Sequence, residues 1–312
     1  MTETANTLRQ FSAPSSANGK SPRVAVLLCT KDGERFLNEQ LESLAHQTHE
    51  NWILYASDDG SNDKTREIIA SFAAATNQRV TLREGPQYGF CQHFLSLAAD
   101  PSIRADYFAF CDQDDIWFPK KLDWALNWLM TIPQHIPALY GTRAELITAE
   151  GNPYGRSPLF TRKPSFQNAL VQNLAGGNTL VFNLAAKKII EQGGIVDVVA
   201  HDWWIYQLIS AAGGALFYDP RPSVKYRQHT ENLIGSNLGW RRRLTRVRQL
   251  FSSRYRDWIE LNLVALQSCT HLIQPTNKIP LGRFAKARKS GSLLQRLVYL
   301  KRSRVYRQTF IW

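Results

Sequence analysis

Short apolar runs alternate with segments of helical period through the first hundred residues of the chain. The run at 23–29 is apolar almost throughout, which is typical of a strand buried on both faces of a parallel sheet. The segment after it carries apolar residues at helical spacing, at Phe36, Leu37, Leu41 and Leu44. The order then repeats with a strand, a helix and a strand, predicted at 52–56, 64–75 and 79–83. Two successive strand–helix–strand units predict a doubly wound α/β sheet.

A fourth apolar run, at 107–111, ends in three carboxylates within four residues, Asp112, Asp114 and Asp115. Carboxylates this close repel one another, and a divalent cation relieves the repulsion because Mg²⁺ binds one or two carboxylates and keeps positions for substrate phosphates. Pro119 then favours a helix start, and a helix is predicted at 120–130. Ligands of open α/β sheets bind at the carboxyl ends of strands, so the pattern predicts a metal and diphosphate site. Three acids that merely cap the next helix are the weaker interpretation.

Polar, acid-bearing turns also follow the first two strands, at 30–33 and 57–63. Asp59 in the second turn offers hydrogen-bond acceptors to a base or ribose, but ordinary turn chemistry explains Asp-Asp-Gly-Ser equally well. The chain has neither G-x-G-x-x-G nor G-x-x-x-x-G-K-[ST]. Neither a dinucleotide-binding fold nor a P-loop is therefore supported.

The composition of the 312 residues, 44% of them hydrophobic, allows one large domain or one domain plus an appendage. Since no stretch of 18 apolar residues occurs, no transmembrane helix is expected. The polar segment 1–21 lacks the apolar core of a signal peptide and is predicted to be a disordered lead-in. The four cysteines are far apart and lie mostly in apolar runs, which favours buried, reduced thiols in a cytosolic protein.

The net charge of +12 is concentrated at one end of the chain. Residues 240–312 contain 17 Lys and Arg against 2 acidic residues, whereas 1–239 contain 21 basic and 24 acidic residues. Apolar residues recur there at helical spacing between the basic ones, at Leu244, Val247, Phe251, Tyr255 and Trp258, and again at Leu293, Leu294, Leu297 and Val298. A basic amphipathic helix predicts contact with a membrane surface or a partner. The alternative is a helix that packs on the body and keeps its basic face in solvent.

Three motifs together resemble one known family: the run 24–30, then Ser57-Asp58-Asp59-Gly60-Ser61, then Asp112-Gln113-Asp114-Asp115-Ile116-Trp117. They are similar to the family 2 glycosyltransferases of the GT-A fold, with Asp112-Gln113-Asp114 resembling the D-x-D motif. The Asp-Ile-Trp ending is most similar to bacterial rhamnosyltransferase-like members. The resemblance covers about 23–237. It implies a mixed, mainly parallel sheet with helices on both faces at 22–239, followed by a basic helical tail at 240–312.

The resemblance also implies a nucleotide site and a metal site. Thr30, Asp32 and Asp59 would hold the nucleoside of a sugar nucleotide, and Arg83 would lie near it. Asp114 would bind a divalent cation, Mn²⁺ or Mg²⁺, with Asp112 alongside in contact with the nucleotide.

In relatives a Gly-Gly-Asn-Thr segment such as 176–179 lines the donor-sugar pocket. Paired glycines let the backbone approach a ligand closely, and Asn178 and Thr179 offer donors and acceptors to sugar hydroxyls. A tight turn before the strand predicted at 180–183 is the alternative interpretation.

Inverting transfer of a sugar to a hydroxyl needs a base near the acceptor oxygen, usually a carboxylate. Family members carry this base in an acidic dipeptide at a helix start, and His201-Asp202 matches its second position. Asp202 is therefore the predicted base, and a helix N-cap is the structural alternative. Trp203 is a candidate for stacking on a sugar ring, although aromatic residues after a cap are more often core.

Late in the body, Arg227 and His229 follow a strand-like run. In relatives a late His reaches the metal or the diphosphate, and a neutral imidazole suits Mn²⁺ better than Mg²⁺. The forked guanidinium of Arg suits phosphate. We predict His229 as a metal or diphosphate ligand and Arg227 as a diphosphate ligand.

The resulting hypothesis is a metal-dependent, inverting glycosyltransferase. It would move a sugar, with L-rhamnose favoured, from a nucleoside-diphosphate sugar to a bacterial surface glycan such as O-antigen or capsule, lipid-linked acceptors included. It would be cytoplasmic and peripheral on the inner face of the bacterial cytoplasmic membrane.

Two other functions are alternatives to it. A sugar nucleotidyltransferase normally has a glycine-rich phosphate loop near its amino end, which 30–33 does not supply. A pI near 9.7 suggests nucleic-acid binding, but the excess basic residues are confined to the tail and no binding motif occurs in the body. No nucleic-acid partner is therefore predicted.

Overall fold

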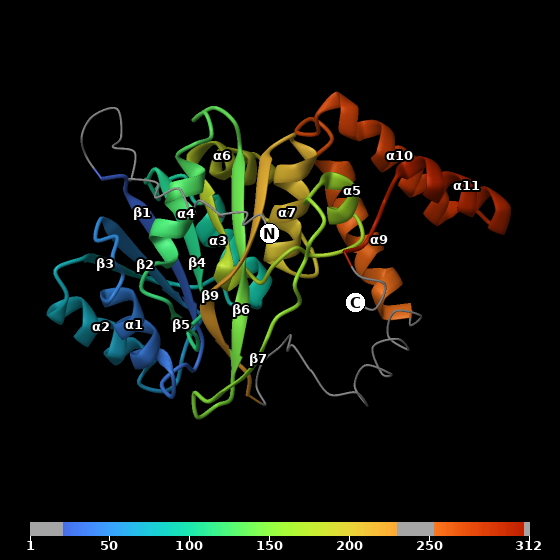
Figure 1. Ribbon diagram of the computed structural model, residues 1–312. Helices are drawn as coiled ribbons and strands as arrows, with labels where there is room; N and C mark the ends of the chain where they lie inside the picture. Colours follow the sequence, from blue (N-terminus) through green and yellow to red (C-terminus); the bar gives the residue numbers. More distant parts are fainter. Residues whose placement is uncertain (1–20, 230–252, 309–312) are drawn as a thin grey trace, which may run out of the picture.

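The computed structural model describes residues 21–229 and 253–308 of the chain. Its strands are β1 (Val24–Thr30), β2 (Trp52–Asp58), β3 (Arg79–Glu84), β4 (Tyr107–Cys111), β5 (Ile116–Trp117), β6 (Ala138–Ile147), β7 (Pro153–Arg156), β8 (Val181–Asn183) and β9 (Ala215–Arg227). Within the described residues they form one sheet in the order β3-β2-β1-β4-β8-β6-β9-β5, with β7 paired to β6 (Figure 1).

The sheet is mixed and mainly parallel, as predicted. Strands β1 to β4 pair in parallel, and β6 and β9 run in the same direction as they do. The exceptions are β8, which is antiparallel to both β4 and β6, and the short strands β5 and β7. The doubly wound part, β3-β2-β1-β4, is the part that the repeated strand–helix pattern predicts.

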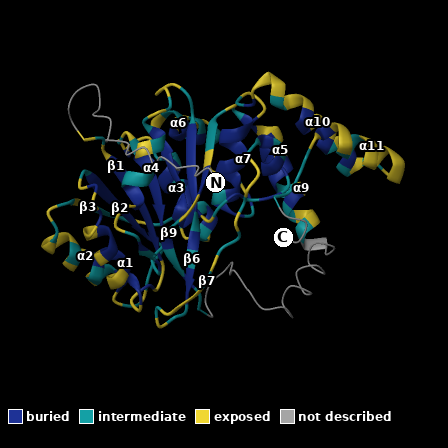
Figure 2. Ribbon diagram, in the orientation of Figure 1, coloured by how far each residue is buried: buried dark blue, intermediate teal, exposed yellow. Residues whose placement is uncertain are grey.

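Helices cover both faces of this sheet, which confirms the predicted layering. One face carries α1 (Leu37–Ala45), α2 (Thr65–Ala75) and α4 (Lys121–Leu129); the other carries α3 (Phe90–Ala99), α5 (Phe166–Ala169), α6 (Leu184–Gly193) and α7 (His201–Ala211). The period of two in β1 explains the arrangement, because Ala25 and Leu27 face one apolar cluster while Val26 and Leu28 face the other. Figure 2 shows the sheet buried between the layers.

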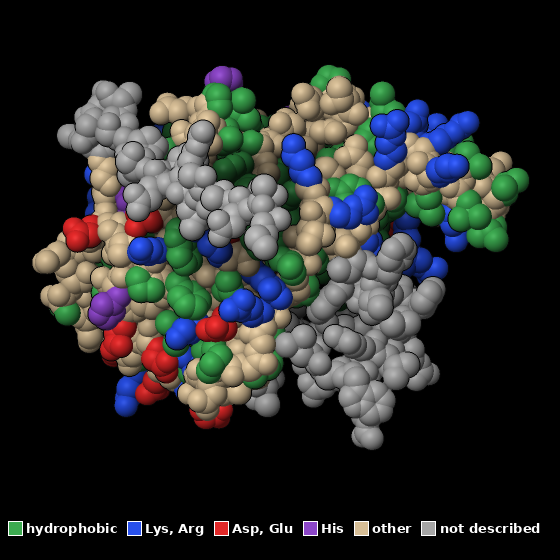
Figure 3. All heavy atoms as spheres, viewed as in Figure 1, with side chains coloured by type: hydrophobic (Ala, Val, Ile, Leu, Met, Phe, Trp, Pro, Cys, Tyr) green, Lys and Arg blue, Asp and Glu red, His purple; other side chains and the backbone are tan. Residues whose placement is uncertain are grey.

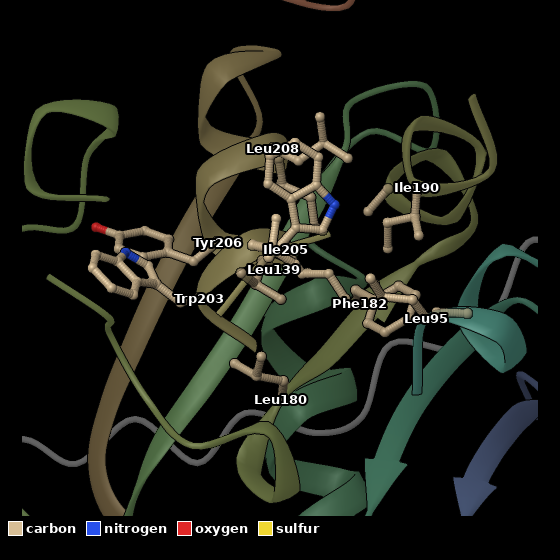
Figure 4. Packing of buried hydrophobic residues seen from close by; sticks show 14 of the residues in the cluster. Leu95, Leu139, Leu180, Phe182, Ile190, Trp203, Ile205, Tyr206 and Leu208 are labelled. Carbon is tan, nitrogen blue, oxygen red and sulfur yellow. The ribbon is translucent and has the colours of Figure 1, made fainter. Parts of the chain in front are cut away.

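The cluster around α7 is the larger of the two and fixes the position of that helix. Trp203, Ile205, Tyr206 and Leu208 of α7 lie among side chains of the sheet and of its neighbouring helices (Figure 4). Each fully buried Leu or aromatic side chain contributes about 1.5–3 kcal/mol. The start of α7, which carries Asp202, is therefore held firmly against the sheet.

The chain after residue 252 forms α9 (Ser253–Ser268), α10 (Pro275–Lys289) and α11 (Leu293–Ser303). Helix α9 packs on the body, because Ile259, Leu263 and Leu266 belong to the same apolar cluster as α7. Helix α11 differs, since four of its apolar side chains are 40–73% exposed: Leu293, Leu294, Leu297 and Val298. The predicted lead-in and the apolar positions Leu244, Val247 and Phe251 lie outside the described residues.

Helix α5 is short and ends at Ala169, and polar Gln172 and Asn173 follow soon after it. The segment 151–163, rich in Gly, Pro and Arg, contains strand β7. All four cysteines are buried and free, as expected. Among the helices of the described chain, none combines the length and apolar character needed to cross a bilayer.

Candidate functional site

The carboxyl ends of β1, β2 and β4 meet at one edge of the sheet. In the paired registers Thr30 lies opposite Asp58, and Leu28 lies opposite Cys111, so the turns that follow these strands are neighbours. Gln113 joins two of them: its Oε1 accepts from the Lys31 N–H at 2.8 Å and its Nε2 donates to the Lys31 carbonyl at 2.9 Å. The turns predicted to carry the site are therefore brought together.

Asp114 and His229 meet although they are 115 residues apart. The Nε2 of His229 lies 2.7 Å from Oδ2 of Asp114, and both side chains are largely buried. Strand β9 makes the meeting possible, because it runs alongside β5, directly after the acidic turn, and ends two residues before His229. A carboxylate and an imidazole this close together are a pair of metal ligands that suits Mn²⁺.

Asp112 and Asp202 lie close enough for the charge of Asp202 to affect the ionisation of Asp112. Burial, followed by the negative charges of Asp114 and Asp202, raises the pKa of Asp112 to about 8. Extra positive charge at this place would relieve the repulsion.

The residues present fit a divalent cation that binds together with a ligand. No group of three or more His, Cys, Asp or Glu side chains in the described part of the chain is arranged around a metal position. Asp114 and His229 would supply two ligands, and phosphate oxygens and water would supply the others, which is the usual way in which Mg²⁺ is bound.

The third acid of the turn, Asp115, points into the protein. Its fully buried carboxylate accepts hydrogen bonds from the Asn178 side chain and, at 3.0 Å, from the Arg227 N–H. Burial raises the pKa of Asp115 well above its usual range. Asp115 thus ties the acidic turn to 176–179 and to the end of β9.

Lys121 is a second buried charge behind the turn. Its ammonium donates to the Asn178 carbonyl and lies 3.9 Å from the centre of the Trp117 ring. Burial lowers its pKa to about 7. Sequence reasoning missed this residue, although a signal exists: Lys121 lies on the stripe of α4 formed by Leu122, Ala125, Leu126 and Leu129.

Asp202 lies in the first turn of α7, where Ala200 is the N-cap. Its carboxylate accepts from the N–H of Gly177 at 3.1 Å and from that of Trp203 at 2.6 Å, so it joins α7 to the segment 176–179. Burial raises the pKa of Asp202 to about 6, and the hydrogen bonds oppose the rise. A carboxyl group with this pKa is ionised at neutral pH and is basic enough to accept a proton.

The side chain of His201 leaves no room for a side chain at position 177, which is a glycine. A Cβ at Gly177 would lie 2.3 Å from Nε2 of the buried His201 ring, which cannot withdraw because it stacks on Phe94 with centroids 4.2 Å apart. We expect Gly177→Ala to lower the free energy of unfolding by about 1–3 kcal/mol, measured by denaturant titration. The matched control is Gly282→Ala in α10, where a Cβ meets nothing within 4 Å; it should leave stability unchanged or raise it slightly. Equal effects of both substitutions would contradict this explanation.

His201 also makes folding sensitive to acid. Neither ring nitrogen has a hydrogen-bond partner in the part of the chain that the structure describes, and burial lowers the pKa of His201 to about 3. The unfolded chain, with a His pKa near 6.5, binds the proton more readily, so this group destabilises the fold as pH falls from about 6.5 towards 3. We expect His201→Leu to lose less stability than the wild type between pH 7 and pH 4.5 in thermal unfolding. Parallel losses in both proteins would remove His201 as a cause.

The predicted nucleoside residues lie at the same edge of the sheet or beside it. Asp32 is 48% exposed and its Oδ1 accepts from the Asn62 N–H at 2.8 Å. Asp59 accepts from the Gln87 N–H at 2.6 Å. Thr30 is buried and donates to Asp58 at 2.9 Å.

Arg83 has partners within the fold. Its guanidinium pairs with Asp100, donates to Ser102 at 3.2 Å and lies over the Tyr55 ring. These contacts tie β3 to the end of α3.

Three other predicted ligand residues also have internal partners. Asn178 bonds Asp115, and the Thr179 hydroxyl donates to the Gly176 carbonyl at 2.8 Å. Trp203 is 5% exposed and stacks on Tyr255, with centroids 6.1 Å apart. Through these contacts the three residues support the site from within the protein.

The Arg227 guanidinium is almost fully buried and bridges three segments. It donates to the Asp114 carbonyl at 2.9 Å, to the Ala149 carbonyl at 2.7 Å and to Glu39 Oε2 at 2.7 Å. Arg227 therefore holds the acidic turn against α1, whatever else it binds.

Comparison with known families gives one match that covers half of the chain. The family described as Glycosyl transferase family 2 matches residues 25–181, which include β1 to β4 and the acidic turn.

Among curated proteins, dTDP-rhamnosyl transferase RfbG of Shigella flexneri is 24% identical over 245 residues, covering 73% of this chain and 81% of its own length. WfgD of Escherichia coli, named as a UDP-Glc:alpha-D-GlcNAc-diphosphoundecaprenol beta-1,3-glucosyltransferase, is 27% identical over 118 residues, 38% of this chain and 44% of its own.

Two solved structures share the fold. S. aureus TarS 1-349 in complex with UDP-GlcNAc superposes with a TM-score of 0.54 at 13% identity, covering 90% of this chain and 89% of that one. Mannosyltransferase PcManGT from Pyrobaculum calidifontis, in complex with GDP-Man and Mn²⁺, gives 0.50 at 17% identity, covering 90% and 79%. These likenesses establish the GT-A fold of the chain.

Proposed function

Because the chain belongs to glycosyl transferase family 2, we propose that it transfers a sugar from a nucleoside-diphosphate sugar to a hydroxyl group with inversion at the anomeric carbon. The observation that carries this proposal is that the acidic turn, His229 and Asp202 lie close together at one edge of the sheet. Asp202, with a pKa of about 6, shares its surroundings with Asp112, and the Asp114–His229 pair adjoins them.

Asp202 is the proposed base. It takes the proton of the acceptor hydroxyl as that oxygen attacks the anomeric carbon from the face opposite the leaving diphosphate. Its hydrogen bonds from Gly177 and Trp203 fix the carboxylate in one orientation. No covalent intermediate is needed, so a single displacement inverts the configuration.

Asp114 and His229 are the proposed ligands of a divalent cation, with Asp112 next to them. When bound, the cation would neutralise the negative charge that develops on the departing nucleoside diphosphate. Asp115 and Arg227 keep the acidic turn in place through their buried contacts. The turns with Asp32 and Asp59 would hold the nucleoside.

The donor and acceptor are proposed from relatives. A rhamnosyl donor is suggested by the similarity to RfbG, which is named as a dTDP-rhamnosyl transferase. A bacterial glycan carried on a lipid diphosphate is suggested by WfgD, whose printed acceptor is a diphosphoundecaprenol sugar.

Peripheral binding to an anionic membrane is proposed for α11, whose exposed apolar residues lie among basic ones. We expect Leu294→Ser with Leu297→Ser to weaken binding to phosphatidylglycerol vesicles at least about tenfold, since each buried Leu is worth about 1.5–3 kcal/mol. Co-sedimentation measures the effect. The matched control pair is Ile195→Ser with Val264→Ser, which are also exposed but lie outside α11. Equal binding by both double variants would exclude α11 as the membrane contact.

The function is tested by incubating the protein with a panel of sugar nucleotides and glycan acceptors, with and without Mn²⁺. Release of a nucleoside diphosphate together with glycosylated acceptor is the expected result. Release of pyrophosphate would instead indicate a nucleotidyltransferase, and turnover that is unchanged by chelation of divalent cations would refute the metal role.

A further inference from the structure

A cavity lies apart from the acidic turn, between the body and the C-terminal helices. Its volume is about 740 Å³, and α9, α10, α11 and the segment 305–308 form its walls together with Arg162 and Val171 of the body. None of the proposed catalytic or nucleotide-binding residues lines it. Figure 3 shows Lys and Arg side chains gathered over α10 and α11, beside apolar side chains.

The cavity joins an apolar wall to a basic one. The apolar wall consists of Val171, Ile259, Phe284, Ala287, Leu300 and Val305. Five arginines also line it: Arg162, Arg256, Arg288, Arg296 and Arg307. No Asp or Glu is among the described residues that line it. An apolar surface beside concentrated positive charge suits an amphiphile with an anionic head.

The positive charge of this wall is incompletely neutralised inside the protein. The acid that pairs with Arg288 is Glu260, whose carboxylate is 3.8 Å from Nε, too far for a hydrogen bond. The Nε atoms of Arg288 and Arg307 are buried and have no hydrogen-bond partner among the described residues. Burial and the neighbouring charges of Arg256 and Arg296 lower the pKa of Arg288, although Glu260 opposes this. A buried donor without an acceptor is costly, so the site favours an added anion.

Aromatic rings hold two of the arginines in place. The Arg307 guanidinium donates to the Tyr255 hydroxyl at 2.9 Å, and Arg162 lies 3.8 Å from the centre of the Tyr306 ring. Tyr255 in turn stacks on Trp203, the neighbour of Asp202. The cavity is thus one aromatic layer away from the start of α7.

We propose that this cavity binds the phosphate group of an amphiphile. The phosphate would be held by Arg288 and Arg307, whose forked guanidinium groups match phosphate oxygens, and the apolar chain would lie against Ile259, Phe284 and Leu300. The ligand comes from the membrane, because a free phosphate has no apolar group that could bury the apolar wall of the cavity. This proposal does not depend on glycosyl transfer.

The test uses two probes that share a phosphate monoester. Dioctanoyl phosphatidic acid, below its critical micelle concentration, and sn-glycerol 3-phosphate are titrated into the full chain by calorimetry. We expect the lipid to bind at least about tenfold more tightly, because its chains bury apolar surface. Arg288→Gln with Arg307→Gln should weaken lipid binding by about tenfold or more.

The matched control pair is Lys289→Gln with Arg302→Gln, which removes the same charge from exposed residues of α10 and α11 outside the cavity. It should bind the lipid like the wild type. If the double variant fails to fold, Arg296→Gln is measured instead. Arg296 lines the cavity but is exposed, and its substitution should also weaken lipid binding. Equal affinity for both probes would show a free-phosphate site and overturn the amphiphile. No binding of either probe, or equal losses in the cavity and control pairs, would overturn the site itself.

Discussion

Replacing Asp202 with Asn is expected to lower turnover at least about 100-fold while leaving nucleoside-diphosphate binding unchanged. The amide keeps the size of the side chain and one of the two oxygens that accept from the Gly177 and Trp203 N–H groups, but it cannot accept the proton of the acceptor. Turnover is measured as diphosphate release, and binding by calorimetry. Asp197→Asn is the matched control, since it removes an exposed carboxylate five residues earlier and should have little effect.

The pH profile makes the same test in the wild-type protein. Only ionised Asp202 acts as a base, and its pKa is raised to about 6. Turnover should therefore rise with pH through about 6 and level off above it. Near-normal turnover in the Asn variant, or a wild-type rate that stays constant between pH 5 and pH 7, would remove Asp202 from the role of base.

Asp114→Ala is expected to weaken Mn²⁺-dependent binding of a nucleoside diphosphate by roughly 100-fold or more, because it removes one of two protein ligands of the cation. Binding measured in EDTA should barely change. The truncation also removes the contact between Asp114 and His229 at 2.7 Å, so Asp114→Asn is measured beside it. The amide removes the charge and keeps a hydrogen-bonding group.

The matched control for Asp114 is Asp257→Ala on α9, an exposed carboxylate far along the chain from the acidic turn. It should bind the nucleotide and Mn²⁺ as the wild type does. Unchanged Mn²⁺-dependent affinity in both Asp114 variants would refute the assignment of the metal ligand.

The doubly wound half of the fold was predictable because its signals are local. A strand buried on both faces is mostly apolar, as β1 is up to Cys29 and β4 is along its length. Helix α3 also has the spacing of an amphipathic helix at Cys91, Phe94, Leu95 and Ala98, so the sequence contains the information for it. Strand β8 lies where a strand is predicted at 180–183, but its three residues do not reveal that it runs antiparallel to β4 and β6.

The candidate site was predictable only as a set of strand ends. Residue type and topology predict that the turns after β1, β2 and β4 lie at the same sheet edge, and the family resemblance adds Asp202. Neither reveals which side chains are committed to the fold. Arg227 is buried because Glu39, 188 residues earlier, and the Asp114 carbonyl both accept from it. Asp115 differs from Asp114 through its pairing with Asn178. Contacts between residues this far apart in the sequence produce no periodic pattern, so they cannot be predicted from the sequence alone.

The central claim is that a cation at the acidic turn neutralises a departing nucleoside diphosphate. Crystals soaked with Mn²⁺ and a nucleoside diphosphate test it most directly through anomalous difference density. We predict a peak between Asp114, His229 and the diphosphate oxygens. A nucleotide bound at the edge of β1 and β2 with no Mn²⁺ beside Asp114 would contradict the claim.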